Sequence, residues 1–592
     1  MRRHDPIKNV SERRPGPRDV PARILVVFHT RTGHTRRVGK TVSTSGELTP
    51  AAQALLVRAL AAALGGTGGT GGAPARPIET HISHVLLHGG HAYKLKKVMA
   101  ASFIDQSTLA RRRHACAEEL RLNRRLAPDL YLDVVEITGT PAAPRIGGAG
   151  PVLDVAVHMR TFDEQGLWDR LAVRGALHSA DVDALAVVLA RFHAEAAVAP
   201  AEGPYGTLPA ARQALLDSLR DLQALAPRAG WPDAEGLASL RRLRTWEATA
   251  FARIEPVMAR RRAQGRVREV HGDLHLGNVA REGTRCLVFD GIEFNEAFRW
   301  LDVMDEVAFM TMDLHAHGLP ALAHRFVNAY LEASGDYEGL RVFDYYLVHR
   351  ALVRAKVAQL RLAQVARVAQ AGLPEDSDRA DALAAAQRYF DLALRLATPR
   401  PHAWFITHGL PGSGKTTLSQ GLVEAAGAVR VRADIERKRL AGLAPRQNSR
   451  SAPGQGLYTP AMNEATQARL LQAATSVVEG GWPVIVDATF IRRAVREEAR
   501  RCAARLQVPF HILRFDAPPE VLRARVCERA ARAADASEAD EAVLAAQQQA
   551  LEPLQPDELE RTFEVLASTA AEGAAAQVDW APLLARLAAI TG

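Results

Sequence analysis

Two separate stretches of the sequence hold the residue types that enzymes use to move a phosphoryl group. The first is REVHGDLHLGNVAREGTRCLVFDGIEF, residues 268–294, in which Asp273, Asn278 and Asp290 follow one another. A carboxylate such as Asp273 can orient an acceptor hydroxyl and take its proton. Asn278 and Asp290, the second of which ends an apolar run, can ligate the Mg²⁺ ions that neutralise phosphate charge. The spacing therefore predicts a magnesium-dependent phosphotransfer site.

Such a site also needs a cation on the phosphates, and an upstream hairpin offers one. SHVLLHGGHAYKLKK, residues 83–97, predicts two strands joined at a Gly-Gly pair, because paired glycines supply the positive φ of a tight turn. Side chains alternate along a strand, so Lys94 and Lys96 share a face. We expect Lys94 to contact the phosphates, with Lys96 as the alternative. A helical pattern farther on carries Glu118 and Glu119, either of which could pair with the lysine.

The order Lys94, Glu119, HGDLHLGN and FDGIEF resembles the aminoglycoside phosphotransferase family, a branch of the protein-kinase-like fold. The resemblance implies an α+β domain of two lobes. It implies that Lys94 binds the ATP phosphates and that Glu119 is its partner. It also implies a base, Asp273, and two metal ligands, Asn278 and Asp290.

The resemblance covers roughly residues 78–395, and one part of the family pattern is missing. No glycine-rich loop precedes the hairpin, where the sequence reads ETHIS (79–83). We therefore expect the cover over the nucleotide to come from residues 80–83. Two later acids, Asp302 and Asp305, are expected to be structural and to pair with backbone near the catalytic loop.

The second stretch is GLPGSGKTT, residues 409–417, which matches the P-loop pattern in full. An apolar strand pattern precedes it and a helical pattern follows it, as the motif requires. Glycines let backbone N–H groups fold around the β-phosphate at a helix N-terminus. Lys415 is expected on the β- and γ-phosphate oxygens and Thr416 on Mg²⁺. The predicted ATP-binding residues are Gly409, Pro411, Gly412, Ser413, Gly414, Lys415, Thr416 and Thr417.

Acidic residues end two further apolar runs downstream of the P-loop. VRVRAD ends at Asp434 and VIVD ends at Asp487. A later helical pattern carries Arg525 and Arg529, with Arg532 after them, ahead of an acidic loop. An arginine-rich mobile lid over the transferring phosphate is typical of small-molecule kinases. The alternative for these arginines is a solvated helix face.

This region resembles the P-loop kinase group that includes polynucleotide kinase, chloramphenicol phosphotransferase and zeta toxins. The resemblance implies that Asp434 is the base for the acceptor hydroxyl and that Asp487 lies near Mg²⁺ or the acceptor. It also implies that Arg525 and Arg529 contact the γ-phosphate. No basic groove with interleaved aromatic residues supports nucleic-acid end repair, so nucleic acid is not expected as a partner.

Three segments are expected to position these residues, since 592 residues are too many for one core. Residues 1–47 form a basic extension, 48–398 the kinase-like domain, and 399–592 an α/β domain with a parallel sheet flanked by helices. The composition of GGTGGTGGAPARP (65–77) predicts a flexible linker. The joining of the two modules itself resembles a bacterial family of two-module proteins, over residues 48–592.

The basic extension accounts for most of the net charge of the chain. Residues 1–40 hold eleven Lys/Arg and three Asp/Glu, a net of +8 out of +9. Within it, ILVVFHTRTGHTRRVG (24–39) resembles the first strand and phosphate loop of flavodoxins, but a whole flavodoxin does not fit before the hairpin. We expect a fragment without a flavin.

The remaining composition excludes several classes of protein. Four cysteines lie far apart without a CxxC pair, which indicates buried thiols in a reducing compartment. The apolar runs are too short to span a bilayer or to form a signal peptide. We therefore expect a cytoplasmic protein without a membrane partner.

Two hypotheses follow for the function. The preferred one is an ATP- and Mg²⁺-dependent phosphotransferase with two ATP-binding modules, which transfers the γ-phosphate to hydroxyls of small molecules. The alternative is a regulatory ATP-binding or ATPase switch with a degenerate kinase-like domain. The presence of Asp273, Asn278, Asp290, Lys415 and Asp434 favours the enzyme.

Overall fold

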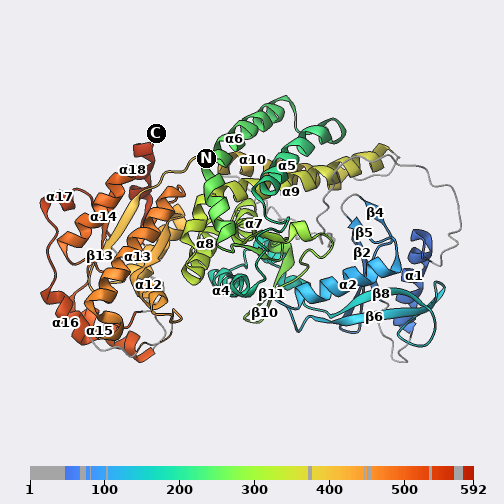
Figure 1. Cartoon of the computed structure of the whole chain (residues 1–592), viewed down its shortest axis with the longest axis horizontal. Helices are drawn as coiled ribbons and strands as arrows, with labels where there is room; N and C mark the ends of the chain where they lie inside the picture. Colours follow the sequence, from blue (N-terminus) through green and yellow to red (C-terminus); the bar gives the residue numbers. More distant parts are fainter. Residues whose placement is uncertain are drawn as a thin grey trace, which may run out of the picture.

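The computed structural model arranges the chain as a sheet-rich lobe, a central helical lobe and a C-terminal sheet with helices on its faces (Figure 1). The described residues are 47–66, 75–80, 82–101, 104–370, 376–445, 447, 449, 455–532, 537–565 and 578–591. The predicted flavodoxin-like fragment and most of the glycine-rich linker lie outside them.

The N-terminal lobe is an antiparallel sheet of six strands in the order β1-β2-β3-β8-β6-β7. Its strands are β1 (Arg76–Glu79), β2 (Ser83–His88), β3 (His91–Lys96), β6 (Tyr131–Thr140), β7 (Ala143–Ile146) and β8 (Val152–Arg160). Helices α1 (Pro50–Gly66) and α2 (Leu109–Asn123) pack on it, and β4 (Ala100–Ala101) pairs with β5 (Ile104–Asp105).

The predicted hairpin is confirmed, with Gly89 and Gly90 at φ +57° and +80° between β2 and β3. Strand β1 was not predicted, because its sequence, RPIE, contains a proline and has a charged residue at each end. The ETHIS segment is therefore the turn between two paired strands.

The central lobe is mostly helical. Its helices are α3 (Trp168–Val173), α4 (Ser179–Glu195), α5 (Leu208–Ala229), α6 (Ala234–Ala263), α7 (Val303–Ala316), α8 (Pro320–Ser334), α9 (Leu340–Gln370) and α10 (Asp376–Leu396). Two short antiparallel pairs frame the predicted catalytic loop, β9 (Val267–Glu269) with β12 (Trp300–Asp302) and β10 (Val279–Glu282) with β11 (Arg285–Val288). The two-lobed α+β class is the predicted one.

The C-terminal part is a parallel sheet in the order β14-β15-β13-β16-β17, with helices on both faces (Figure 1). Its strands are β13 (Trp404–His408), β14 (Val429–Arg432), β15 (Val484–Asp487), β16 (Phe510–Arg514) and β17 (Thr562–Glu564). Its helices are α11 (Lys415–Ala426), α12 (Ala433–Leu440), α13 (Pro460–Glu479), α14 (Arg493–Arg505), α15 (Pro519–Arg532), α16 (Glu541–Gln549), α17 (Pro556–Leu559) and α18 (Ala581–Thr591). The predicted α/β P-loop class is confirmed, and β17 is an additional strand.

The helical lobe and the parallel sheet share one hydrophobic core. Phe343 of α9, Val431 of β14 and Val477 of α13 belong to the same buried cluster. The ring of Trp482 lies 5.8 Å from that of Phe343, and β14 packs against α8. A cut at the predicted division, 398/399, would therefore expose apolar surface on both sides. The division itself stays a prediction.

Cysteines and helices bear on two further expectations. All four cysteines are free, and Cys116 and Cys502 are buried, but Cys527 is exposed on α15, so the expectation of four buried thiols is wrong. None of the helices in the described ranges is long and apolar enough to cross a bilayer.

Candidate functional site

The first candidate site is the loop between β9 and β10, which holds Asp273 in a buried position. The Nδ2 of Asn278 donates to Asp273 Oδ2 at 3.2 Å and to the Asp273 carbonyl at 2.9 Å. Oδ1 of Asp273 is buried and has no hydrogen-bond partner among the described residues. One carboxylate oxygen is thus fixed and the other is left for a substrate group.

The charge of Asp273 is maintained by its neighbours. Burial raises the pKa of this carboxyl. Two neighbours lower it by more than burial raises it: His275, whose Nε2 lies 3.5 Å from Oδ2, and Arg354 of α9. The net result is a pKa below the ordinary value for aspartate, so Asp273 is ionised at neutral pH and can accept a proton.

Two acids on α7 hold the backbone of this loop. Glu306 Oε1 accepts the Gly272 N–H at 2.7 Å, and Asp313 Oδ2 accepts the Leu276 N–H at 3.0 Å. Both acids are buried, and their spacing of seven residues places them on one face of the helix. Sequence reasoning missed them, although two acids at helical spacing in an apolar run were a usable signal.

The expectation that Asp302 and Asp305 pair with backbone holds for one contact of Asp302 and misses the main partners of both acids, which are buried arginines. Asp302 pairs with buried Arg261 at 2.8 Å and caps α7 through the Met304 N–H. Asp305 pairs with Arg350 at 2.8 Å, so both acids are structural but neutralise buried arginines. A buried guanidinium needs a carboxylate more than a backbone N–H does, because an unpaired charge costs far more to bury.

Asp290 reaches the site from the far end of the β10–β11 hairpin. The Phe289 N–H donates to the Asn278 carbonyl at 3.1 Å, which brings Asp290 close to Asn278, twelve positions earlier in the sequence. Asp290 has φ +64°, a left-handed conformation uncommon outside glycine, and its N–H donates to the Tyr131 hydroxyl at 3.1 Å. The turn directs its carboxylate toward Lys94 of the N-terminal lobe.

Lys94 joins the two lobes. Its Nζ lies 2.5 Å from Asp290 Oδ1 and 2.7 Å from Glu119 Oε1. Burial lowers the pKa of Lys94, but Asp290 and Glu119 raise it well above its ordinary value. Lys96 is fully buried and pairs with Glu119 at 2.5 Å and with Glu293. Lys94 is therefore the lysine that pairs with Asp290 beside the predicted catalytic loop, and Lys96 pairs with Glu293 instead.

The predicted cover segment, residues 80–83, is a tight turn in which residue 81 lies outside the described residues. The Thr80 hydroxyl donates to the Ser83 carbonyl at 2.8 Å, and the Ser83 N–H donates back to it at 2.9 Å. Ser83 is fully buried, so its side chain cannot cover a nucleotide. That part of the expectation is wrong, because Ser83 begins a central strand.

The second candidate site is the P-loop between β13 and α11. Gly412 has φ +84° and Gly414 φ +88°, and a Cβ on Gly412 would lie 2.7 Å from the Leu522 carbonyl oxygen. Ser413 is buried and its hydroxyl has no partner among the described residues. An unpaired buried hydroxyl at a helix N-terminus suits a phosphate oxygen.

Lys415 and Thr416 differ in what they contact. The Lys415 ammonium donates to the carbonyls of Gly409 and Leu410, each at 2.9 Å, and burial lowers its pKa to about 8. The Thr416 hydroxyl donates to Asp487 Oδ2 at 2.6 Å. Phosphate oxygens would give Lys415 stronger, charge-assisted partners than the carbonyls.

These residues border a cavity of about 1540 Å³. Asp434, Asp487, Arg525 and Arg529 line it, together with every predicted P-loop residue except Gly409. Asp434 lies in the first turn of α12, two residues beyond β14, where the sequence predicted a strand end. The cavity thus brings the two acids and the P-loop together.

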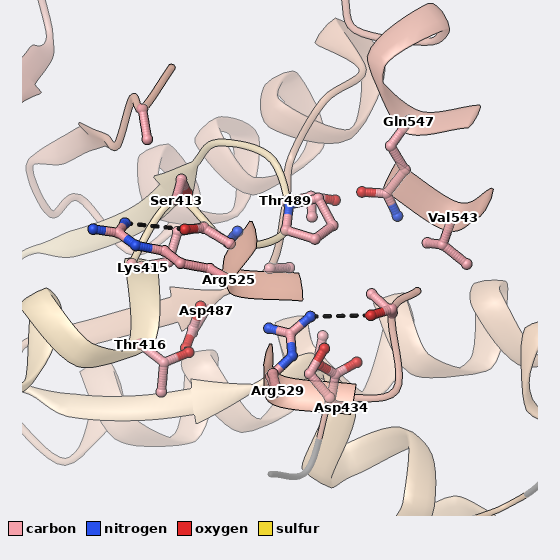
Figure 2. Close-up of a pocket in the computed structure, with 18 of the residues that line it drawn as sticks. Ser413, Lys415, Thr416, Asp434, Asp487, Thr489, Arg525, Arg529, Val543 and Gln547 are labelled. Atoms are coloured by element: carbon pink, nitrogen blue, oxygen red, sulfur yellow. Dashed lines mark hydrogen bonds between the residues drawn. The ribbon is translucent and has the colours of Figure 1, made fainter. Parts of the chain in front are cut away.

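The two arginines of the predicted lid contact backbone carbonyls of residues that line the cavity. Arg525 donates to the Gly412 carbonyl at 3.2 Å, and Arg529 donates to the Ala539 carbonyl at 3.2 Å. Figure 2 shows Arg525 beside the P-loop and Arg529 between the P-loop and Asp434. Arg529 is half-buried and Arg525 is exposed, and their contact with the γ-phosphate stays a prediction. Sequence reasoning missed further lining residues, namely Tyr458, Asn463 and Arg492.

Both sites fit the ligand demands of Mg²⁺ bound with ATP. Across the described ranges, no group of three or more His, Cys, Asp or Glu is arranged to hold a metal ion alone. Mg²⁺ in such sites needs one or two carboxylates, because phosphates and waters supply the other oxygens. Thr416 with Asp487, and Asn278 with Asp290, offer that partial set.

Comparisons with known proteins match both parts of the chain. A family described as AAA domain matches residues 405–554. Uncharacterized proteins Rv2004c of Mycobacterium tuberculosis and Mb2027c of Mycobacterium bovis are each 31% identical over 478 residues, 79% of this chain and 89% of the relative. This aligned length exceeds either predicted module, so these relatives share the joined pair.

Two solved structures are similar to separate parts. A choline/ethanolamine kinase family protein from Mesorhizobium loti is 13% identical, with a TM-score of 0.32, over 57% of this chain and 99% of that chain. A gluconokinase from Sinorhizobium meliloti 1021 is 20% identical, with a TM-score of 0.21, over 28% of this chain and 83% of that chain.

Proposed function

The chain belongs to the same family as protein Rv2004c of Mycobacterium tuberculosis, and we propose that it is an ATP-dependent phosphotransferase with two sites that act on hydroxyls of small molecules. The observation that supports this most directly is the cavity shared by the P-loop, the Thr416–Asp487 pair and Asp434. A nucleotide switch needs the first two features. A carboxylate on the same cavity, beyond the phosphate-binding loop, is what a transferase adds.

In the P-loop site, each residue has a distinct proposed role. Lys415 and the loop N–H groups bind the β- and γ-phosphates, and Arg525 and Arg529 stabilise charge on the transferring group. Thr416 and Asp487 would hold Mg²⁺, which neutralises phosphate charge when bound. Asp434 takes the proton of the acceptor hydroxyl, and Arg437, 3.0 Å away, orients its carboxylate.

In the first site, the roles follow the lobes. Asp273 is the base, because its free Oδ1 can accept a hydroxyl proton while Oδ2 is held by Asn278. Lys94, oriented by Glu119, binds phosphate from the N-terminal lobe. Asn278 and Asp290 would hold Mg²⁺; the Nδ2 of Asn278 is engaged with Asp273, so its Oδ1 is the atom free for a metal.

The side chains around Asp434 favour an acidic acceptor at the P-loop site. Arg432, Arg437 and Arg492 line the same cavity as Asp434, in addition to Lys415 and the lid arginines that we assign to ATP. Arginine binds carboxylates and phosphates in a two-pronged geometry. We therefore expect hydroxyl compounds that carry an anionic group to be better acceptors than their neutral analogues.

The test uses the full chain, γ-labelled ATP, and paired acceptors such as hydroxy acids and their amides or alcohols. We expect labelled products that disappear from one acceptor set with Asp273→Asn and from another with Asp434→Asn. Lys415→Ala should remove the second set as well. Label released as phosphate with no labelled acceptor across a broad metabolite pool would contradict the proposal and favour the ATPase switch.

A further inference from the structure

Arg430, in the middle of β14, donates hydrogen bonds to α11, the helix that follows the P-loop. The residue is 5% exposed, and its Nη1 donates to the Thr416 carbonyl at 2.5 Å and to Ser419 Oγ at 3.3 Å. Its Nη2 donates to Gln420 Oε1 at 3.0 Å. The guanidinium therefore fixes the first turn of α11, the turn whose Thr416 hydroxyl contacts Asp487.

The other side of Arg430 is set by the helical lobe. β14 is the edge strand of the parallel sheet, and the outward N–H of Arg430 donates to Asn328 Oδ1 of α8 at 2.7 Å. Glu332, one turn along α8, has its Oε1 3.5 Å from the Arg430 Nε. Within the described part of the chain, Glu332 is the acid that forms an ion pair with Arg430, and its Oε2 also lies 3.8 Å from Nη1 of Arg432.

These contacts give α8 a role in the neighbouring module. A buried guanidinium is stable in one geometry only while its charge is compensated. Glu332 supplies that compensation and Asn328 fixes the strand, so the position of the Thr416 backbone depends on both. We infer that Asn328 and Glu332 are positioning residues for the P-loop site, and that the kinase-like module completes the nucleotide site of the P-loop module.

This inference rests on the proposed function, because it assumes that the P-loop binds Mg²⁺ and nucleotide. Residues that orient metal ligands from outside typically change metal affinity by about 10- to 100-fold when altered. Altering a residue that only stabilises the contact between the two modules would instead lower the stability of the fold, without a selective effect on Mg²⁺ affinity. The two roles are separable at equilibrium.

The experiment measures binding of a fluorescent ADP analogue to the full chain as Mg²⁺ is titrated. The signal lost in Lys415→Ala defines the P-loop site. We expect Glu332→Gln to raise the Mg²⁺ concentration for half-saturation of that signal by about tenfold. Arg430→Lys, which keeps the charge but loses the two-pronged donor, should do the same and serves if Glu332→Gln does not fold.

The matched control is Glu479→Gln, the same substitution at the same module interface. Glu479 pairs with Arg341 of α9 at 3.1 Å and does not touch Arg430. It should leave the Mg²⁺ midpoint within about twofold. Equal midpoints for Glu332→Gln and the control overturn the inference while the proposed function stands. Absence of any Lys415-dependent signal in the unaltered chain overturns both.

Discussion

The two candidate sites hold the lysines that we propose to bind phosphate in opposite ways. Lys94 lies between the carboxylates of Glu119 and Asp290, which belong to a helix of one lobe and a loop of the other. Lys415 lies on two backbone carbonyls of its own loop, and its pKa is lowered to about 8. One lysine is neutralised by two acids in ion pairs. The other forms no ion pair among the described residues, and the nearby Asp487 and Asp434 offset only part of its desolvation.

The difference teaches how each site would respond to ATP. At the first site, bound phosphate would compete with Asp290 for Lys94. Nucleotide and metal would therefore bind together, because the metal would become the partner of Asp290 in place of Lys94. At the P-loop the phosphate replaces neutral carbonyls, so binding relieves a desolvated charge. Four measurements separate these behaviours.

The largest expected effect is on transfer at the first site. Asp273→Asn removes the base and should lower the rate of acceptor phosphorylation there by about 10²–10⁴-fold. Nucleotide affinity should change little, since Asp273 contacts Asn278 and His275 and not Lys94. Asp290→Ala is the control and should weaken Mg-ATP binding instead. If Asp273→Asn transferred phosphate at the normal rate, Asp273 would not be the base, and the first site could no longer be compared with the P-loop site as a phosphotransfer site.

At the P-loop site the corresponding change is Asp434→Asn. We expect a loss of acceptor phosphorylation near the lower end of that range, about 10²-fold, because Asp434 borders a wide cavity where water can take the proton. Its affinity for an ATP analogue should stay within a few-fold of the unaltered chain. Lys415→Ala should lose affinity and transfer together. If both variants lose affinity equally, Asp434 serves the metal rather than the acceptor.

The pH dependence of binding should differ between the sites. Bound phosphate favours protonated Lys415, and in the free protein this lysine loses its proton near pH 8. Above pH 8 binding must take up a proton, so ATP affinity at the P-loop should fall by up to about tenfold per pH unit. The first site should stay constant through this range, because the pKa of Lys94 is raised.

Isothermal titration of an ATP analogue at pH 7, 8 and 9, with Asp290→Ala to silence the first site, measures this. Lys415→Arg is the control, since its side chain stays charged and its affinity should not depend on pH in this window. A flat profile in the unaltered P-loop would show that Lys415 is not desolvated.

The smallest effect concerns two glycines with similar backbone angles. Gly90→Ala places a Cβ in open space at φ +80° and should cost about 1–2 kcal/mol for the left-handed conformation. Gly412→Ala adds a clash with the Leu522 carbonyl of α15 and should cost about 1–3 kcal/mol more. Calorimetric melting temperatures of the two variants measure the difference. Equal losses of melting temperature in the two variants would mean that α15 shifts away from the P-loop and removes the clash.

Local motifs were predictable from the sequence because they are contiguous. GLPGSGKTT and HGDLHLGN specify the backbone of their own loops, and the apolar runs of the parallel sheet each formed a strand. Glu306 and Arg430 were not predicted, although both act on those loops. Their partners lie 34 residues away for Gly272 and 102 residues away for Asn328, and no local pattern encodes such pairings.

The choice between Lys94 and Lys96 also required the structure. The two side chains share a strand face, and both contact Glu119. What separates them is the third partner, Asp290 for one and Glu293 for the other. These acids are three residues apart on a loop whose path depends on the left-handed turn at Asp290.

The covering of β14 by α8 has a consequence for how the chain is made. An uncovered edge strand can pair with another chain, and parallel sheets form slowly. Translation adds about 5–20 residues per second, and β14 follows α8 by roughly 100 residues, so α8 leaves the ribosome several seconds earlier. α8 is therefore available to cover β14 as soon as that strand has been synthesised. If the modules were in the reverse order, β14 would be synthesised before α8, and the edge of the nascent sheet would stay uncovered until α8 was made.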